Sequence, residues 1–593
     1  MNMPLPPATS GPLRTLLLRL LMLLPMLLPA GAARAAEAGN LPGQSYLVLC
    51  YHSVPTTADG GSGSNSTTNF AGQMAWLRGN GYTAISMDDV LQAKAGGKPL
   101  PPKSFMLTVD DGYEDFYQNV FPLLKLYRMP AVFALVGRWI EEGRDPELAV
   151  TDPGYASQHF VNWAQVKEMA ASGLVEMASH SYDLHHGILA NPQGNTEPAA
   201  VTQEYKAERQ TYETPEERRV RVREDLIRNS ELIARHTGKK PRIMVWPYGA
   251  ADRIAADEAA AAGMPINLTL ADGLGTTGDT EVISRNLIGM ELPLTSFTYM
   301  VAHEQEPANT DTVRAVKINL DRLYDTDPAR QDEKLGRLME QTARLGVNTV
   351  LLQPLSAPAG GRYFSEAYFP NSVLPMRSDL LNRVAWQFRS RLGVDVFMLV
   401  DTGAVARTES GILHPLAFAD PEDREHLLTL YGELSLAAAA QGLMFSDDAS
   451  DRAQFEFNAQ LLARSAYLRP PMLFYSARSE DGADRILSKF GATAMTAPVD
   501  RVALPAPVDA PPSRLEAFLA RLPSNRAGML SLPVKDAGEQ ELENIARKVS
   551  YFQRRGVRDF VLDGDAFMDD PAKLDLMRKA VSLKNNPVAP AIK

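Results

Sequence analysis

The chain has 593 residues, of which 45% are hydrophobic and 22% are charged, and its formal net charge is −11. This length exceeds what one ordinary hydrophobic core accommodates, so two domains are predicted. The composition excludes an intrinsically disordered protein. The acidic balance argues against nucleic-acid binding, because that affinity depends on cationic side chains that neutralise phosphates.

Residues 1–35 have the pattern of a secretory signal peptide. Arg14 and Arg19 precede the apolar run 20–28, and Ala33-Arg34-Ala35 forms a small-x-small cleavage site. The alternative, an uncleaved membrane anchor, is disfavoured because the run is shorter than the roughly 20 residues that span a bilayer. Cleavage removes three arginines and no acidic residue, which changes the net charge from −11 to −14. We therefore predict export to a bacterial periplasm.

Strands alternate with helices after this leader, which predicts a parallel sheet, closed or open. The first predicted strand, Tyr46–Tyr51, contains the only cysteine, Cys50, and ends at His52. A single cysteine excludes an intrachain disulfide, and none lies near the cleavage site to carry a lipid. Further strands are predicted at 81–85, 105–109, 131–136 and 243–246, and helices at 70–79, 116–127 and 224–237.

The remaining segments divide the chain. The polar stretch 186–221 is predicted to be a surface insertion, and the first domain is predicted to cover residues 36–302, followed by a linker at 303–312. A second alternation over 313–593 predicts a (β/α)8 barrel, whose sites lie at the carboxyl ends of its strands. Its seven strand candidates are 315–320, 349–352, 395–400, 443–445, 472–475, 528–532 and 559–562, and Asp321, Gln353, Asp401 and Asp563 lie at or just past such ends.

The triplet Asp110-Asp111-Gly112 directly follows the predicted strand 105–109. Adjacent residues on a strand point to opposite faces, so both carboxylates serve one site only if Gly112 lets the chain turn sharply. One carboxylate would then bind a divalent metal while the other acts as a base. The alternative is a turn or a helix cap, for which the same residue types are common.

Two imidazoles complete the predicted metal site. His180 and His185 lie about 140° apart around an ideal helix, so we predict a loop or a distorted turn instead of a helix face. The chain has nine histidines, and their concentration at 180, 185 and 186 favours a metal site over a structural cluster. We predict Asp111, His180 and His185 as ligands, His186 as a bystander and Asp183 as a residue that orients a ligand. Three ligands leave a coordination position open for water, as catalysis requires.

These residues resemble a known family. Residues 108–112 resemble the first motif of the polysaccharide deacetylases, carbohydrate esterase family 4, and the histidine turn resembles their second. The closer resemblance is to the poly-β-1,6-N-acetyl-D-glucosamine N-deacetylases of biofilm export systems, in which these histidines are also five residues apart. His52 matches their catalytic histidine, and residues 245–249 match their third motif. The resemblance covers nearly the whole mature chain.

The resemblance also implies a fold. It implies an N-terminal polysaccharide-deacetylase (β/α) barrel with a rearranged motif order and a C-terminal (β/α)8 barrel that is similar to glycoside hydrolases. Two departures from the wider family concern the first domain. Val245 stands where most members have an arginine that steadies the base, and the late Leu-x-Ile-His motif is absent from this domain. Both departures imply a weakly braced base and a slow enzyme.

The implied chemistry is metal-assisted amide hydrolysis. Asp110 removes a proton from water, and His52 protonates the leaving amine. The metal lowers the pKa of bound water from 15.7 toward ~7 and, with the backbone N–H of Tyr248, stabilises the oxyanion. Trp246 and Pro247 belong to the same substrate-binding motif. Zinc suits these ligands best, although nickel or cobalt would also fit.

The second domain contains a loop, 360–371, that is rich in aromatic residues, among them Tyr363, and also contains Glu366. Aromatic faces stack on sugar rings, and carboxylates bind the ammonium group of a deacetylated glucosamine. Three further acids, Asp447, Asp448 and Asp451, follow a predicted strand. The alternative is that these acids are helix caps and solvated loop residues. We favour polymer binding over cleavage, although paired carboxylates also support glycoside hydrolysis.

The sequence therefore predicts a periplasmic, metal-dependent N-deacetylase of poly-N-acetylglucosamine that acts during export and biofilm formation, with an outer-membrane export porin as a further partner. Three rivals remain open. The same metal apparatus serves chitin or peptidoglycan deacetylases and O-acetyl esterases. A polysaccharide-binding scaffold with a vestigial site is the second rival, and a barrel whose glycosidase activity is the main function is the third.

Overall fold

The computed structural model divides into two compact units, which are residues 1–190 with 196–309, and residues 191–195 with 310–593. The residues that it describes are 44–57, 64–143, 159–271, 273–289, 291–303, 312–357, 361–445, 452–469, 471–476, 501–506, 508, 511–520, 528–532 and 538–583. The predicted leader lies outside these ranges. Among the helices that the described residues form, none has the length and apolarity to cross a bilayer.

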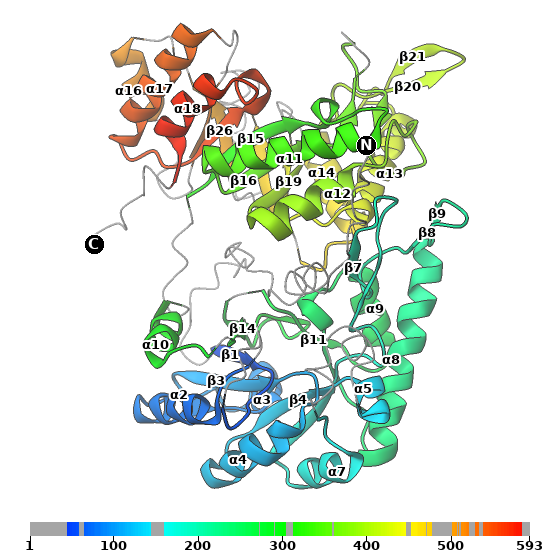
Figure 1. The fold of residues 1–593 in the computed structure, drawn as a ribbon, viewed down its shortest axis with the longest axis vertical. Coiled ribbons are helices and arrows are strands. Elements are labelled where there is room, and N and C mark those ends of the chain that lie inside the picture. The colour runs from blue at the N-terminus through cyan, green and yellow to red at the C-terminus, as the bar shows by residue number, and fades with distance from the viewer. Residues whose placement is uncertain are drawn as a thin grey trace, which may run out of the picture. The chain divides into compact units, whose positions relative to one another are not determined.

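The first unit is built on a mainly parallel sheet. Its path runs β12-β1-β3-β4-β5-β10-β11-β13, with β14 beside β1 and β2 beside β3. Figure 1 labels β1, β3, β4, β11 and β14 of this sheet. The strands are β1 (Ser45–Tyr51), β2 (Thr83–Ala84), β3 (Ser104–Val109), β4 (Ala131–Leu135), β5 (Val175–Ser179), β10 (Ile243–Val245), β11 (Ile266–Leu268), β12 (Gly275–Thr276), β13 (Val282–Ile283) and β14 (Asn286–Leu287).

This sheet is nearly closed. Strand β13 is parallel to β11 at one end of the path, and β14 is parallel to β1 at the other. Only Ser284 and Arg285 separate β13 from β14 in the chain. The wall of the sheet therefore curls back on itself, as predicted for a deacetylase-type barrel. All parallel neighbours end at the same edge, which is where His52 and Asp110 follow β1 and β3.

Alternate residues of the strands pack into two separate cores. Leu47 and Leu49 of β1 join one cluster with Phe70 and Met74 of a helix, whereas Val48 faces a second cluster. This alternation follows from the two-residue period of a strand. The outer helices of the unit are α2 (Thr67–Gly79), α3 (Met87–Lys94), α4 (Phe121–Tyr127), α5 (Gly137–Glu142), α7 (Trp163–Ala171), α8 (Pro215–Thr237), α9 (Arg253–Ala261) and α10 (Leu294–His303) (Figure 1).

The predicted insertion is shorter than expected. It holds two small hairpins, β6 (Gly187–Leu189) with β7 (Thr196–Pro198) and β8 (Tyr205–Lys206) with β9 (Thr211–Tyr212). Helix α8 begins at Pro215, so the predicted start at 224 is wrong. The start follows from local chemistry, because Thr214 and Glu217 form a capping box and proline is favoured at the first helical position.

The second unit is a closed barrel of eight parallel strands. The strands are β15 (Arg314–Asn319), β16 (Thr349–Gln353), β19 (Asp395–Val400), β22 (Gly442–Phe445), β23 (Met472–Ser476), β24 (Arg501–Pro505), β25 (Gly528–Leu532) and β26 (Phe560–Asp563). The predicted barrel is thus confirmed. Strand β24 was missing from the strand candidates, because its polar first residue and terminal proline obscure the apolar pattern.

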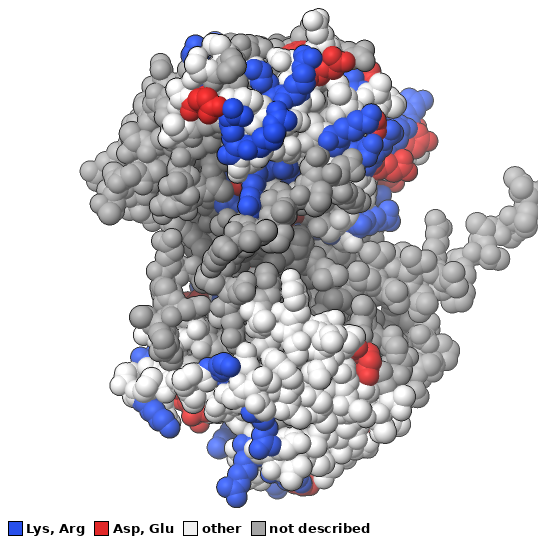
Figure 2. Space-filling view, turned by 90° about the vertical axis from the view of Figure 1, so that its left-hand side faces the viewer, with Lys and Arg blue, Asp and Glu red and all other residues white. Residues whose placement is uncertain are grey.

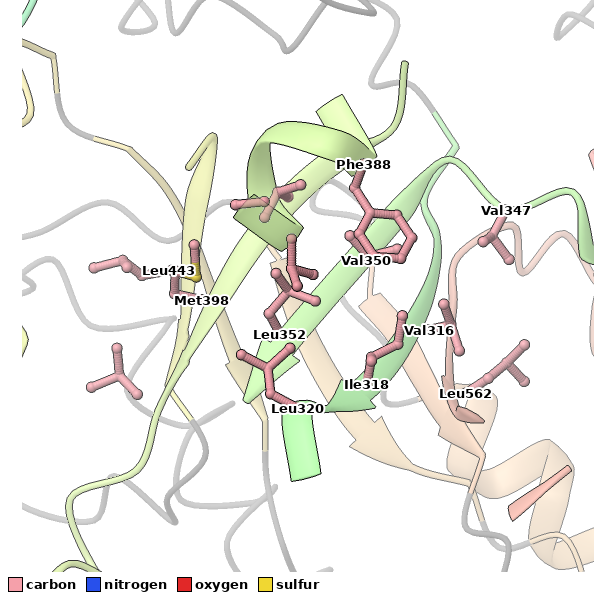
Figure 3. Packing of buried hydrophobic residues seen from close by; sticks show 14 of the residues in the cluster. Val316, Ile318, Leu320, Val347, Val350, Leu352, Phe388, Met398, Leu443 and Leu562 are labelled. Atoms are coloured by element: carbon pink, nitrogen blue, oxygen red, sulfur yellow. The ribbon is translucent and has the colours of Figure 1, made fainter. Parts of the chain in front are cut away.

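Side chains of the barrel strands also alternate between two cores. Val350 and Leu352 of β16 face the surrounding helices, where Phe388 lies close to Val350 (Figure 3), and Leu351 faces the barrel interior. The surrounding helices are α11 (Pro328–Leu345), α12 (Leu381–Gln387), α13 (Pro421–Ala437), α14 (Arg452–Arg464), α16 (Pro512–Leu519), α17 (Glu539–Gln553) and α18 (Pro571–Val581). In the view of Figure 2, basic and acidic side chains lie interspersed on the described surface of this unit.

Candidate metal centre and its surroundings

Asp111, His180 and His185 meet at the carboxyl edge of the first sheet. The Asp111 Oδ1 atom lies 3.4 Å from the Nε2 atom of each histidine. Ligand atoms at about 2.0–2.1 Å from one tetrahedral ion would be about 3.3 Å apart, so the spacing fits a shared ion. Within the described structure, Asp111 Oδ1 is buried and accepts no hydrogen bond, as an atom reserved for a metal would be. These residues can therefore hold a divalent cation.

A tight backbone turn brings both aspartates of the triplet to this edge. Asp111 has a φ of 75° and Gly112 a φ of 87°, both in the left-handed region. The glycine was expected to make this turn alone, whereas Asp111 itself also adopts the left-handed conformation. That conformation costs a residue with a side chain roughly 1–2 kcal/mol. The surrounding fold offsets this cost. The turn places the two neighbouring carboxylates at the same edge of the sheet.

The two histidines lie in a turn, as predicted, and this turn follows β5, which was not among the predicted strands. The Nδ1 atom of His180 is 2.7 Å from the carbonyl oxygen of Val245, and this bond leaves Nε2 to face Asp111. The expectation that Asp183 orients a ligand is wrong, because its carboxylate pairs with Arg138 at 2.7 Å. The backbone of Val245 performs that orienting role for His180.

Helix α8 holds the histidine turn from one side. The carboxylate of Asp225 accepts hydrogen bonds from the backbone N–H groups of Tyr182 and Asp183, at 2.8 and 2.7 Å. One helical turn later, the Asn229 amide donates to Ser179 Oγ at 2.8 Å. Residues four apart lie on one helix face, so α8 contacts the chain at two points around His180.

Helix α5 holds the same turn from the other side. The backbone N–H groups of Gly137 and Arg138 donate to the carbonyl oxygens of Ser181 and Tyr182, at 3.2 and 3.0 Å. A Cβ atom at position 137 would lie 2.3 Å from Asn229 Oδ1, so glycine is required for this close approach. The segment between the two histidines is therefore fixed by both helices.

Asp110, the predicted base, is buried and forms an ion pair that sequence reasoning missed. Arg285 Nη1 donates to Asp110 Oδ1 at 2.8 Å, and both side chains are at most 1% exposed. Arg285 also donates to Thr108 Oγ1 and to the carbonyl oxygen of Thr269. The prediction of a weakly braced base is therefore wrong. Val245 carries no charge at the position where most members of the wider family have an arginine. Arg285, between β13 and β14, supplies the guanidinium instead.

The electrostatics of the site favour ionised carboxylates beside a neutral histidine. Burial raises the pKa of Asp110, but Arg285, His180 and His52 outweigh it and hold that pKa below its ordinary value. Burial likewise raises the pKa of Asp111, and the neighbouring histidines outweigh it. Burial lowers the pKa of His185 to about 4, so this imidazole is neutral at neutral pH, as a metal ligand must be.

His52, the predicted acid, lies on the other side of Asp110. Its Nε2 atom is 4.0 Å from Asp110 Oδ2, and its side chain is 20% exposed. The chain after His52 is anchored by Asp115, which accepts hydrogen bonds from the Ser53 hydroxyl at 2.5 Å and the Val54 N–H at 2.9 Å. The imidazole thus stands at the opening of the site, next to the base.

Of the predicted third-motif side chains, that of Tyr248 lies against the proposed ligand His185. Its ring centroid is 4.6 Å from that of His185, and its φ of 59° places it in a left-handed turn. Pro247 is buried. Trp246 is fully buried and donates its indole N–H to Asn267 at 2.9 Å, so it supports the fold instead of facing a substrate. Sequence reasoning missed Trp139, whose ring lies 4.6 Å from the His185 ring.

The structure describes only part of the predicted barrel site. Asp447, Asp448 and Asp451 lie outside the described residues. Tyr363 has the guanidinium of Arg362 near its ring, and Glu366 accepts a hydrogen bond from Arg377 at 2.8 Å.

A polar cluster at the carboxyl ends of β15 and β16 was not predicted as such. Asp321 accepts hydrogen bonds from the Ser356 hydroxyl at 2.5 Å and the Tyr368 hydroxyl at 2.6 Å. The ring centroid of Tyr324 lies 6.3 Å from that of Tyr368, and the guanidinium of Arg377 lies 4.5 Å from it on the face of the ring. Carboxylate, hydroxyl and aromatic groups therefore gather at the barrel end where sites of this fold lie.

Comparison with known protein families agrees with this geometry. Residues 97–266 match the family described as polysaccharide deacetylase, and residues 317–470 match "hypothetical glycosyl hydrolase family 13". The first unit thus contains a segment that is similar to the polysaccharide deacetylases, and the second unit contains a segment that is similar to a glycosyl hydrolase family.

Named relatives narrow this class. A poly-β-1,6-N-acetyl-D-glucosamine N-deacetylase of Escherichia coli K12 is 34% identical over 427 residues, which are 69% of this chain and 63% of the relative. A protein of the same name from Staphylococcus aureus N315 is 24% identical over 31% of this chain and 54% of its own length. The match therefore spans less than two thirds of either relative.

Two solved structures are each similar to part of the chain. A de-N-acetylase from Aggregatibacter actinomycetemcomitans is 37% identical, with a TM-score of 0.39, and the match covers 43% of this chain and 99% of that one. A glycoside hydrolase domain from Bordetella bronchiseptica is 22% identical, with a TM-score of 0.38, and the match covers 46% of this chain and 99% of that one.

Proposed function

We propose that the first unit is a metal-dependent N-deacetylase that removes acetyl groups from poly-β-1,6-N-acetyl-D-glucosamine. The convergence of Asp111, His180 and His185 on one point, beside the ionised Asp110, is the observation that carries this proposal. The names of the relatives support the choice of substrate. Nitrogen and oxygen ligands in this number suit zinc, which we propose as the metal.

Each catalytic group has a role that follows from its position. When bound, the ion supplies Lewis acidity at the acetyl carbonyl and toward water. Asp110 accepts the proton of the attacking water, and the backbone N–H of Tyr248 donates to the carbonyl oxygen as negative charge develops there. His52 gives a proton to the nitrogen as the C–N bond breaks, because an amide anion is a poor leaving group. The products are acetate and a free amine.

Acetate release from β-1,6-linked N-acetylglucosamine oligomers tests this proposal. We expect release that stops on chelation and returns on addition of zinc, and slower release from β-1,4-linked oligomers. Equal rates on both linkages would instead identify a chitin-type deacetylase. Release from O-acetylated sugars alone would identify an esterase.

Substitution of the proposed ligands tests the site itself. We expect Asp111→Asn and His180→Ala to abolish acetate release while the thermal unfolding midpoint changes little, because the metal is lost and the fold is kept. The partly buried neighbour His186 offers a matched control, since His186→Ala removes an imidazole that contacts no proposed ligand. Wild-type activity in either purified ligand variant would refute the assignment.

The second unit is proposed to bind the partly deacetylated polymer. Asp321 and Glu366 offer carboxylates for its ammonium groups, and Tyr324 and Tyr368 offer aromatic rings for its sugars. We further propose that the protein acts in the periplasm during export of the polymer, next to an outer-membrane porin. The apolar run and cleavage site of residues 1–35 support the location.

A further inference from the structure

Cys50 lies beside the proposed base and has no role in the chemistry described above. Its Sγ atom is fully buried and donates to Asp110 Oδ2 at 3.5 Å. The same oxygen is 4.0 Å from His52 Nε2. Arg285 occupies the other oxygen of that carboxylate. Three donor atoms of different chemistry, a sulfur, a nitrogen and an oxygen, therefore face one another on the side of Asp110 that points away from Arg285.

The spacing of these atoms fits a second cation. All three lie within 4.8 Å of one another, as the atoms of the Asp111 site also do. Around a tetrahedral ion with a sulfur at about 2.3 Å and an oxygen at about 2.0 Å, those two atoms are about 3.5 Å apart, which the structure already shows. The imidazole needs a shift of roughly 0.7 Å to reach the matching nitrogen position.

The imidazole of His52 has the freedom to make that shift. Its Nδ1 atom is buried without a hydrogen-bond partner in the described structure, so no bond ties the ring to one orientation. The side chain is also 20% exposed, so the imidazole is accessible to an ion from solvent. An ion that binds there displaces the S–H proton, which leaves to solvent.

We propose that Cys50, His52 and Asp110 form a second, thiol-containing site that binds a thiophilic divalent cation, such as cadmium or excess zinc, and thereby inhibits the enzyme. A thiolate selects soft cations. Inhibition follows because the ion occupies both Asp110 Oδ2 and the imidazole of His52, which rests on the roles given to them in the proposed function. The nearby Arg285 and the first ion repel a second cation, so the first site fills first.

A spectroscopic titration of the full-length, zinc-loaded protein with cadmium tests the site directly. Cys50 is the only cysteine of the chain, so an ultraviolet thiolate-to-cadmium charge-transfer band reports on this site alone. We expect the band in the wild type with one cadmium bound per chain at saturation, and none in Cys50→Ser. Asp111→Asn, which lacks a ligand of the first site only, is expected to keep the band.

Two further measurements complete the test. His52→Ala is expected to keep the band but to weaken cadmium binding at least about tenfold, as loss of a ligand does. In acetate-release assays, excess zinc or cadmium is expected to inhibit the wild type and to inhibit Cys50→Ser far less, each relative to its own rate without added metal. Should Cys50→Ser unfold, Cys50→Ala replaces it.

The absence of a charge-transfer band in the folded wild type would overturn the proposal. So would unaltered cadmium stoichiometry in the cysteine variants. The band does not depend on deacetylation, so a failure of the proposed function would leave the second site standing, and the reverse also holds.

Discussion

At the scale of single residues, the ionised form of the proposed base is stabilised by an arginine from a distant part of the chain. Asp110 follows β3, whereas Arg285 lies between β13 and β14, and their contact is 2.8 Å long. A buried carboxylate beside a fixed guanidinium stays ionised, because the ion pair offsets the cost of burial. The base is therefore ready to accept a proton over a wide range of pH.

Removing this guanidinium is predicted to change the pH profile of the enzyme. In Arg285→Gln, the pKa of Asp110 rises, because the adjacent positive charge that lowers it is lost. The base must be ionised to work, so the acidic limb of kcat/KM moves to higher pH by a similar amount. Arg285→Lys keeps the charge and is expected to shift that limb less. An identical acidic limb in Arg285→Gln and the wild type would contradict the role of Arg285.

Sequence reasoning found the three residues that meet at the candidate metal centre but not this arginine. Asp111, His180 and His185 occur in patterns with a fixed spacing, which metal chemistry explains. Arg285 is the only basic residue of the mixed segment 281–289, and its target is 175 residues away in the chain. A single arginine in such a segment is a weak signal of a buried ion pair. Arg285 and Asp110 meet only because the sheet is nearly closed.

At the scale of elements, helix α8 supports the turn that carries both histidines. Asp225 accepts two backbone N–H bonds from this turn, and Arg228 lies 3.5 Å over the ring of Tyr182. Burial raises the pKa of Asp225 to about 7, although the two N–H groups lower it. The folded protein therefore holds a proton on Asp225 at pH values where the unfolded chain has released it.

This difference predicts a pH-dependent stability. Between about pH 4 and pH 7 the folded state binds more protons than the unfolded state, so Asp225 contributes less to the free energy of unfolding as pH rises through this window. We expect the difference in unfolding free energy between the wild type and Asp225→Asn to fall across the window and to stay constant above it. Urea unfolding at several pH values measures this, with the exposed neighbour substitution Glu224→Gln as control. Parallel profiles of the wild type and Asp225→Asn would contradict the prediction.

Elements with strong local signals were predictable, and short or polar ones were not. The buried strands β1, β3 and β4 are continuous apolar runs and were found close to their observed bounds. The first turns of α8 are almost entirely charged, which concealed them within an apparent insertion. Strand β24 begins with Arg501, which forms an ion pair with Asp559 at 3.2 Å. Asp559 directly precedes β26, so the sequence around Arg501 gives no sign of this ion pair.

At the scale of the whole molecule, each unit has hydrophobic cores of its own. The clusters of the first unit and those of the barrel share no residue. A unit with its own core can fold alone. The proposed catalytic groups, including His52, Asp110 and His185, all belong to the first unit. The proposed deacetylation and the proposed polymer binding are therefore assigned to units that can be separated.

Truncation of the chain after residue 309 is predicted to separate them. We expect the remaining first unit to release acetate from short oligomers with the kcat/KM of the full chain. On long polymer, its KM is expected to rise at least about tenfold, because a second linked binding module is lost. Acetate release measured against oligomers of increasing length checks both expectations. Equal KM values on long polymer would exclude a binding role for the barrel.

The two-residue link between β13 and β14 has a consequence for how such an enzyme can change. Ser284 and Arg285 join the strand at one end of the sheet path to the strand that pairs with β1, and the same link steadies the base. An insertion or deletion in this link would disturb both the near-closure of the sheet and the position of Asp110, the proposed base. Variation in length among related proteins is therefore expected to accumulate in the hairpins before α8. The link between β13 and β14 is expected to keep its length of two residues.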